Sequence, residues 1–323
     1  MSITINEWVT RLRDEYLLEF IADGGAAVKI AVATPELRDA VAPAVRQAAD
    51  GYLTAHVDAA QTKVHMVHQL FHAVARQVDW DGMAERWLRA ALPACGILVE
   101  PEQPFSDMET IAHANGRSVQ MLYGDINRLI TNGILCDYRM GKEFRTAMAM
   151  LCLWRINPQN VSSNDAEMLK QWLIGERCNL SALKRMQIHQ RIGRHNARLL
   201  LASLATWSRL VGYRGFVLTL DLTTVIENDV SLLTPVVRYS RAAVLDTYEV
   251  LRQCIDEVDE MTHFLLVAIT GGGLLDPNNP RRNVDNYTAL KLRIIDEVHD
   301  KHRANPLNVM VRLGEPAPEG AAV

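Results

Sequence analysis

Asp221 is the acidic side chain best placed for chemistry, because it directly follows an apolar run typical of a buried strand. A carboxylate at such a strand end can order the water shell of a magnesium ion beside a nucleotide. Thr223 adds a hydroxyl that could hold a metal ion or a water molecule. Leu222 and Thr223 stand where a glutamate would position an attacking water. The pair Asp221 and Thr223 therefore indicates a remnant of a nucleotide and metal site.

A nucleotide site also needs a phosphate-binding loop after an earlier strand. Its usual form is GxxxxGK[ST], in which glycines free backbone N–H groups and the lysine neutralises phosphate charge. Here the apolar run 27–32 is followed by Ala-Thr-Pro-Glu-Leu-Arg-Asp-Ala, with no glycine and no Lys-Ser/Thr pair. Arg38 could replace the lysine, but it lies beside Glu36 and Asp39. We predict that the chain binds no cofactor and catalyses no hydrolysis; binding of ATP with magnesium is the alternative.

Three arginines are candidates for a role in a neighbouring subunit. Arg281 and Arg282 follow Pro-Asn-Asn-Pro in an expected exposed loop, and Arg241 begins an expected helix. An arginine presented across a subunit interface can stabilise charge on a neighbour's γ-phosphate. The alternative interpretation is that all three are ordinary surface cations.

Other polar groupings point more weakly to chemistry. His65, His68 and His72 share one face of an expected helix, a spacing that metal sites use. No acidic or cysteine ligand accompanies them, so an ordinary surface or interface helix is favoured and no metal is expected. Gly271-Gly272-Gly273 lacks a lysine and leads into Pro-Asn-Asn-Pro, which favours a flexible loop after a strand over a phosphate cradle.

Apolar runs and helical spacing predict an α/β fold. Near-continuous apolar runs are typical of strands covered by helices on both faces, and they occur at 27–32, 215–220, 264–269 and, more weakly, 52–57. Amphipathic helices are expected at 36–49 (with Pro43 inside), 62–78, 194–211 and 241–258. Strands that alternate with helices imply a parallel sheet, here P-loop NTPase-like and flanked by helices.

The expected domain organisation has three parts. Residues 1–80 and 194–313 form the P-loop NTPase-like core, residues 81–193 form a large helical insertion, and residues 314–323 form a disordered tail. The insertion is predicted because helical patterning without a convincing strand fills that range.

Composition limits the kind of partner. The 323 residues carry a net charge of −4, which disfavours nucleic acid and anionic membranes as direct partners, so DNA contact would be indirect. No signal peptide or long apolar span is present, and the five cysteines form no CxxC pair. These features predict a cytoplasmic protein without a membrane segment, zinc site or disulfide framework.

Several motifs, in order, resemble the ATP-binding domain family of BREX-type phage-defence systems. They are Gly-Tyr-Arg-Gly at 212–215 leading into the strand that ends at Asp221, the helix from Arg241 to Asp256, Arg281-Arg282 before Tyr287–Leu290, Asn305-Pro306-Leu307 as a closing strand, and Gly24–Lys29 before the first strand. The likeness is strongest over 194–313. The family implies an AAA+/STAND-like P-loop fold and work alongside other defence subunits.

The resemblance and the missing phosphate loop together suggest one leading function and two alternatives. The leading hypothesis is a non-catalytic P-loop ATPase homologue that is a structural or regulatory subunit of a bacterial anti-phage complex. Its partners would be an active ATPase paralogue or other defence subunits, in a homo- or hetero-oligomer. The alternatives are a weak or atypical ATP-binding protein or ATPase, and a DNA-binding module.

Overall fold

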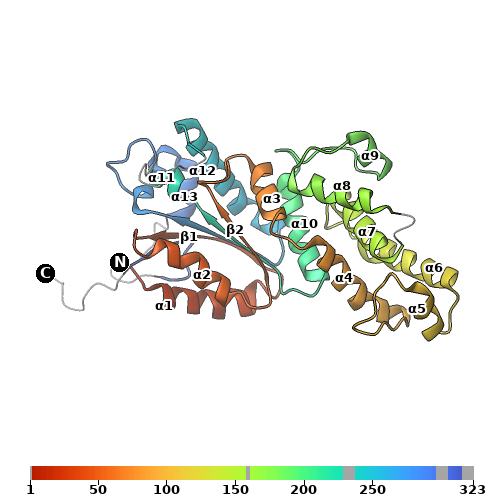
Figure 1. The fold of residues 1–323 in the computed structure, drawn as a ribbon. Coiled ribbons are helices and arrows are strands. Elements are labelled where there is room, and N and C mark those ends of the chain that lie inside the picture. The colour runs from red at the N-terminus through yellow and green to blue at the C-terminus, as the bar shows by residue number, and fades with distance from the viewer. Residues whose placement is uncertain (1, 158–160, 228–236, 296–304, 315–323) are drawn as a thin grey trace. The chain divides into compact units, whose positions relative to one another are not determined.

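Five parallel strands form the sheet of this protein in the order β2-β3-β4-β1-β5, as seen in the computed structural model (Figure 1). The structure describes residues 2–157, 161–227, 237–295 and 305–314. The strands are β1 (Ala26–Ala33), β2 (Leu53–Asp58), β3 (Phe216–Asp221), β4 (Phe264–Thr270) and β5 (Met310–Leu313). All neighbouring pairs are parallel. The predicted α/β fold with a parallel sheet is therefore confirmed.

The burial of each strand explains its sequence pattern. Every residue of β1 and β4 is buried, which is why β4 is a continuous apolar run and β1 is apolar except at Lys29. β2 lies at the sheet edge and alternates between buried and half-buried positions. The closing strand was predicted at residues 305–307, and this prediction is wrong in position, because pairing with β1 begins at Met310.

Contacts divide the chain into two compact units, residues 1–74 with 214–323 and residues 75–213. We call them the α/β unit and the helical unit. The helix at 197–210, which the sequence placed in the core, is grouped with the helical unit. Apart from Gly314, the expected disordered tail 314–323 lies outside the described residues.

Helices cover both faces of the sheet in the α/β unit (Figure 1). One face carries α1 (Ile5–Arg11), the π-helix η1 (Leu12–Phe20) and α2 (Arg38–Ala48); the other carries α11 (Thr223–Glu227), α12 (Arg241–Asp256) and α13 (Thr288–Ile294). The unit also contains α3 (Val67–Ala75) and the 3₁₀ turns η4 (Val258–Glu260), η5 (Gly272–Leu274) and η6 (Val284–Asn286).

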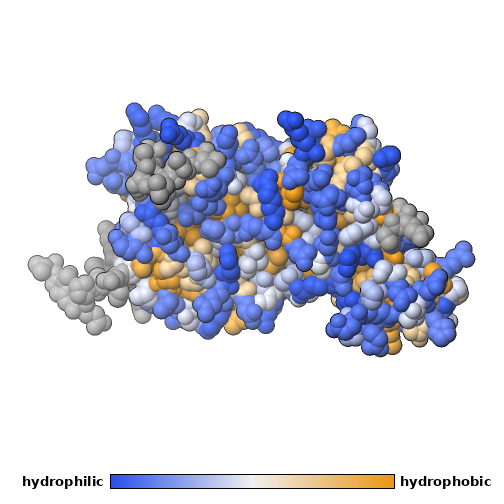
Figure 2. All heavy atoms as spheres, viewed as in Figure 1, coloured by the Kyte–Doolittle hydropathy of each residue, from blue (hydrophilic) through white to orange (hydrophobic). Residues whose placement is uncertain are grey.

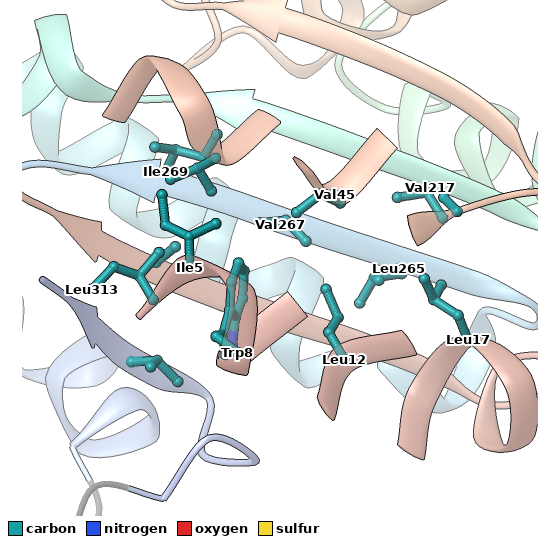
Figure 3. Packing of buried hydrophobic residues seen from close by; sticks show 14 of the residues in the cluster. Ile5, Trp8, Leu12, Leu17, Val45, Val217, Leu265, Val267, Ile269 and Leu313 are labelled. Carbon is teal, nitrogen blue, oxygen red and sulfur yellow. The ribbon is translucent and has the colours of Figure 1, made fainter. Parts of the chain in front are cut away.

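The core on the first face consists of side chains from α1, η1 and α2 packed against alternate residues of the strands. Figure 3 shows Trp8, Leu12 and Leu17 pointing toward the sheet, where they meet Val267 and its neighbours. Trp8 is fully buried. Burial of this much apolar surface is the main force that holds the helices on the sheet.

α3 is shorter than the helix predicted at 62–78. The Tyr239 hydroxyl contacts the carbonyl oxygens of Ala59 (3.1 Å) and Thr62 (2.7 Å) and accepts the N–H of Val64. These bonds hold residues 59–64 in a turn, so the helix begins only at Val67. A contact this distant in sequence lies beyond the reach of helical periodicity.

The helical unit contains no strand among its described residues. Its helices are α4 (Trp80–Ala91), η2 (Leu92–Cys95), α5 (Met108–Ala114), α6 (Val119–Ile130), η3 (Thr131–Leu135), α7 (Lys142–Ile156), α8 (Ser163–Ile174), α9 (Leu180–Arg185) and α10 (Ala197–Leu210). Trp87 of α4 stacks on Trp207 of α10 with ring centroids 6.2 Å apart. This pair and the buried residues of α7 belong to the hydrophobic interior of the helical unit.

Candidate functional site at the carboxyl edge of the sheet

The carboxyl ends of the parallel strands meet at one edge of the sheet, which is where open parallel sheets bind ligands. Asp221 is the last residue of β3 and pairs in register with Asp58 of β2 and Ile269 of β4. Thr270 ends β4 beside this position. The structure therefore places Asp221 where the sequence predicted a functional carboxylate.

Asp221 and Asp58 each use a carboxylate oxygen to close a local turn. Asp221 accepts the N–H of Thr223 at 2.8 Å, and Asp58 accepts the N–H of Ala60 at 2.7 Å. Burial raises the pKa of Asp58, and the charge of Asp221 adds to this rise. Asp221 and Thr223 are therefore in contact, but the contact is made by the backbone N–H of Thr223 and not by its hydroxyl.

Two buried hydroxyls at this edge lack hydrogen-bond partners among the described residues. They belong to Thr223 and Thr270, whose side chains are 4% and 1% exposed. Buried hydroxyls are normally hydrogen-bonded, so this is a local cost in the fold. The sequence placed Thr223 among the candidate site residues but not Thr270, although Thr270 directly follows the apolar run 264–269.

The turn between β1 and α2 has few N–H groups available for a phosphate. Pro35 has none, and Leu37 and Arg38 both donate theirs to the Thr34 carbonyl, at 3.0 and 3.1 Å. Hydrogen bonds from its own backbone N–H and from the Thr34 hydroxyl lower the pKa of Glu36. Glu36 is therefore a carboxylate at neutral pH, and this carboxylate accepts the backbone N–H of the same residue.

Arg38, the only candidate to replace the missing lysine, is already paired. Its Nη1 lies 2.9 Å from Oε2 of Glu227, and the two side chains are only 16% and 21% exposed. Glu227 also packs against Gly271, since a Cβ built on Gly271 would lie 1.5 Å from its Oε1. An internal carboxylate thus occupies the space between α2 and the end of β4.

The three candidate arginines lie in different environments. Arg282 donates to the carbonyl oxygens of Val225 at 2.5 Å and Tyr239 at 3.0 Å, and burial lowers its pKa. Its guanidinium therefore holds α11 within the chain. Arg281 is exposed in the loop before η6, and Arg241 is exposed at the first turn of α12.

A cavity of about 520 Å³ opens at the carboxyl ends of β1 and β5. Its charged lining residues are Arg312 of β5 and Asp276 of the loop after η5, and the β1–α2 turn contributes Thr34 and Pro35. One cation and one carboxylate give the lining no excess positive charge for a triphosphate. No sequence signal indicated this cavity.

The other sequence candidates are not gathered into a metal site. Among the described residues, no three His, Cys, Asp or Glu side chains could hold a metal ion together. His65 lies before the start of α3, whereas His68 and His72 are on it with ring centroids 6.2 Å apart. Gly272 and Gly273 lie in the 3₁₀ turn η5.

The parallel sheet, its helices on both faces and the strand-end carboxylate define a P-loop-like α/β protein. Residues 108–319 match the family described as BREX system ATP-binding protein BrxC/D. The chain belongs to this family. The matched range begins in the helical unit, where the sequence motifs showed little likeness, and it leaves out β1 and the β1–α2 turn.

No curated protein and no solved structure matches the chain. In the part of the chain that the structure describes, none of the helices has both the length and the apolar character needed to span a bilayer. Figure 2 shows hydrophilic side chains spread over the visible surface, with apolar ones between them.

Proposed function

We propose that this protein is a non-catalytic member of the BrxC/D family and is a structural or regulatory subunit of a multi-protein BREX defence complex. The observation that carries the proposal is the β1–α2 turn. The N–H groups of Glu36, Leu37 and Arg38 already have acceptors inside the turn, and Pro35 has none to offer.

The charges around the turn support the same proposal. Bound ATP would need cations and free N–H donors close to its phosphates. Here the Arg38 guanidinium is neutralised by Glu227, and Glu36 adds a second carboxylate nearby. Freeing Arg38 would leave Glu227 partly buried without its partner, which is costly. Nucleotide binding would therefore break existing contacts whose stabilising free energy exceeds that of the new contacts with the turn.

The first test is a calorimetric titration of the full chain with ATP and magnesium. We expect no measurable heat up to about 1 mM ATP, which corresponds to binding weaker than about 4 kcal/mol. The Asp221→Ala variant should give the same flat titration, because its carboxylate holds a turn in this chain. Micromolar binding that disappears in Asp221→Ala would instead favour the alternative of an atypical ATP-binding protein.

The regulatory part of the proposal gives Arg281 or Arg241 a role at a neighbour's nucleotide. Both side chains are exposed, whereas Arg282 is bound within the chain. In a complex with the active ATPase of the same system, Arg281→Ala or Arg241→Ala should lower that enzyme's kcat by about 10³-fold, as expected for an arginine finger. The matched control is Arg46→Ala, since Arg46 is also exposed. If neither variant changes the turnover of the active ATPase, the regulatory role is wrong and only the structural role remains.

A further inference from the structure

The net charge of the chain conceals an uneven distribution. The helical unit carries 17 Lys and Arg against 13 Asp and Glu, so the acidic excess lies entirely in the α/β unit. Residues 176–198 account for the basic excess, with six basic side chains and one acidic side chain, Glu176. This segment runs from the end of α8 through α9 to the start of α10.

Apolar anchors hold this segment on the helical unit and leave its cations in solvent. Leu183 and Ile188 are fully buried, and Met186 and Ile192 are nearly so. Many of the residues between and around these anchors are exposed, and five of the exposed ones are cations: Arg177, Lys184, Arg185, Arg191 and Arg194. We call these five residues the basic surface.

Hydrogen bonds tie the segment to α8 and fix its path before α10. Trp172 of α8 donates its indole N–H to the Gln190 carbonyl at 3.1 Å. Asn196 closes the far end by donating to the Arg191 carbonyl at 3.2 Å. Burial raises the pKa of the Cys178 thiol, and the nearby Arg191 guanidinium partly offsets this rise. The Arg191 guanidinium therefore lies near Cys178, the residue that follows Arg177 in the sequence.

No carboxylate among the described residues forms an ion pair with the basic surface. By contrast, at least half of the ten other arginines of the helical unit form ion pairs: Arg89, Arg117, Arg128, Arg139 and Arg155. Like charges held close together repel one another and concentrate a positive potential. Binding of a polyanion would relieve this repulsion and release its counterions.

The side chains between the cations indicate which kind of polyanion fits. Protein interfaces need an apolar centre. Residues 176–198 expose no large hydrophobic side chain, although Leu199, which directly follows them, is exposed. The exposed neighbours include Asn179, Ser181 and Gln187, which are polar groups of the kind that bond to phosphate and sugar. Gln190 is also exposed, but its amide is already bonded to Glu143 and His195. Arginine predominates, and its planar guanidinium suits phosphate oxygens.

We propose that the basic surface binds the phosphate backbone of a nucleic acid duplex without reading its sequence. The proposal is independent of whether the α/β unit binds ATP. It also assigns a role to a segment that the whole-chain net charge of −4 had seemed to exclude from nucleic acid binding.

Fluorescence anisotropy of a labelled mixed-sequence DNA duplex, titrated with the full chain, tests the proposal. Five phosphate contacts predict that the affinity falls about 20-fold when KCl rises from about 50 to about 100 mM. Arg185→Glu/Arg191→Glu should weaken binding by about tenfold or more and lower the salt dependence by about two contacts. The control Arg46→Glu/Arg128→Glu changes the net charge equally at exposed cations outside the surface and should bind as the wild type does.

Three outcomes would overturn the proposal. They are no binding of the duplex at about 50 mM KCl, equal loss of affinity in the test and control variants, and tighter binding of a polyglutamate peptide than of the duplex. The last outcome would assign the surface to an acidic protein partner. Thermal melting of both double variants confirms that each is folded before its binding is compared.

Discussion

We expect Gly215→Ala to lower the free energy of unfolding by about 4 kcal/mol, among the largest losses for a single methyl group. Gly215 has φ +154°, and a Cβ at this position would lie 2.3 Å from the carbonyl oxygen of His263. That oxygen accepts the N–H of Phe216 at the start of β3. The methyl group must therefore push β3 away from β4 at the centre of the sheet, in addition to the backbone strain.

Gly212→Ala is the matched control, because its φ is also positive, +92°, but nothing lies within 4 Å of its added Cβ. Gly212 ends α10, where loss of glycine costs about 1 kcal/mol. Urea unfolding followed by circular dichroism should separate the two variants clearly. Equal destabilisation would show that backbone conformation alone, and not the close approach to His263, explains Gly215.

These two glycines also give a physical reason for the Gly-Tyr-Arg-Gly motif at 212–215, one of the motifs on which the sequence resemblance rests. Gly212 allows the chain to leave α10, since its N–H bonds to the Arg209 carbonyl in a conformation rare for other residues. Gly215 lets the chain enter β3 directly against β4. The motif is therefore explained by chain geometry and requires no catalytic role.

The strands could be predicted from the sequence because burial on both faces leaves a continuous apolar run. The runs at 27–32 and 264–269 correspond to β1 and β4 within one residue at each end. β5 could not be placed in this way, because its four residues include exposed Arg312 and its position is set by pairing with β1. Short edge strands carry too little burial to leave a pattern.

The candidate site could be predicted only in part. Asp221 was found because it ends an apolar run, and the absence of a phosphate loop is visible in the sequence itself. The pairing of Arg38 with Glu227 was not predictable, since 189 residues separate them. Arg282 looked like a surface cation for the same reason, because its acceptors lie on α11 and at Tyr239. Side-chain partners between distant segments leave no periodic signal.

Lys29 gives the second large effect, a rise in stability with pH. It lies in the middle of β1, 2% exposed, and donates to the Tyr16 hydroxyl at 2.6 Å and the Leu307 carbonyl at 2.5 Å. These partners and the Asn308 carbonyl are neutral. Burial, with no ion-pair partner among the described residues, lowers the pKa of Lys29 to about 8.

The sign of the pH dependence follows from proton binding. Between pH about 8 and the ordinary lysine pKa near 10.4, the unfolded chain keeps a proton on this amine that the folded chain has lost. Lys29 therefore contributes a rise in stability with pH in this window, whereas the buried thiol of Cys152, whose pKa burial raises, contributes a fall above the ordinary thiol pKa of about 8.5. The full rise would be about 3 kcal/mol, at 1.36 kcal/mol for each unit of pKa difference.

Lys29→Met should remove this rise, and urea unfolding measured from pH about 7.5 to about 9.5 tests it. The upper limit matters because burial raises the pKa of Tyr16, so its ionisation above pH 10 lowers stability again. Lys142→Met is the control, since Lys142 is exposed, and it should keep the wild-type slope. At neutral pH the Met variant loses three hydrogen bonds but also a buried charge, so the slope is the decisive readout. A slope retained in Lys29→Met would mean that another group titrates in this range and that Lys29 keeps its proton in the fold.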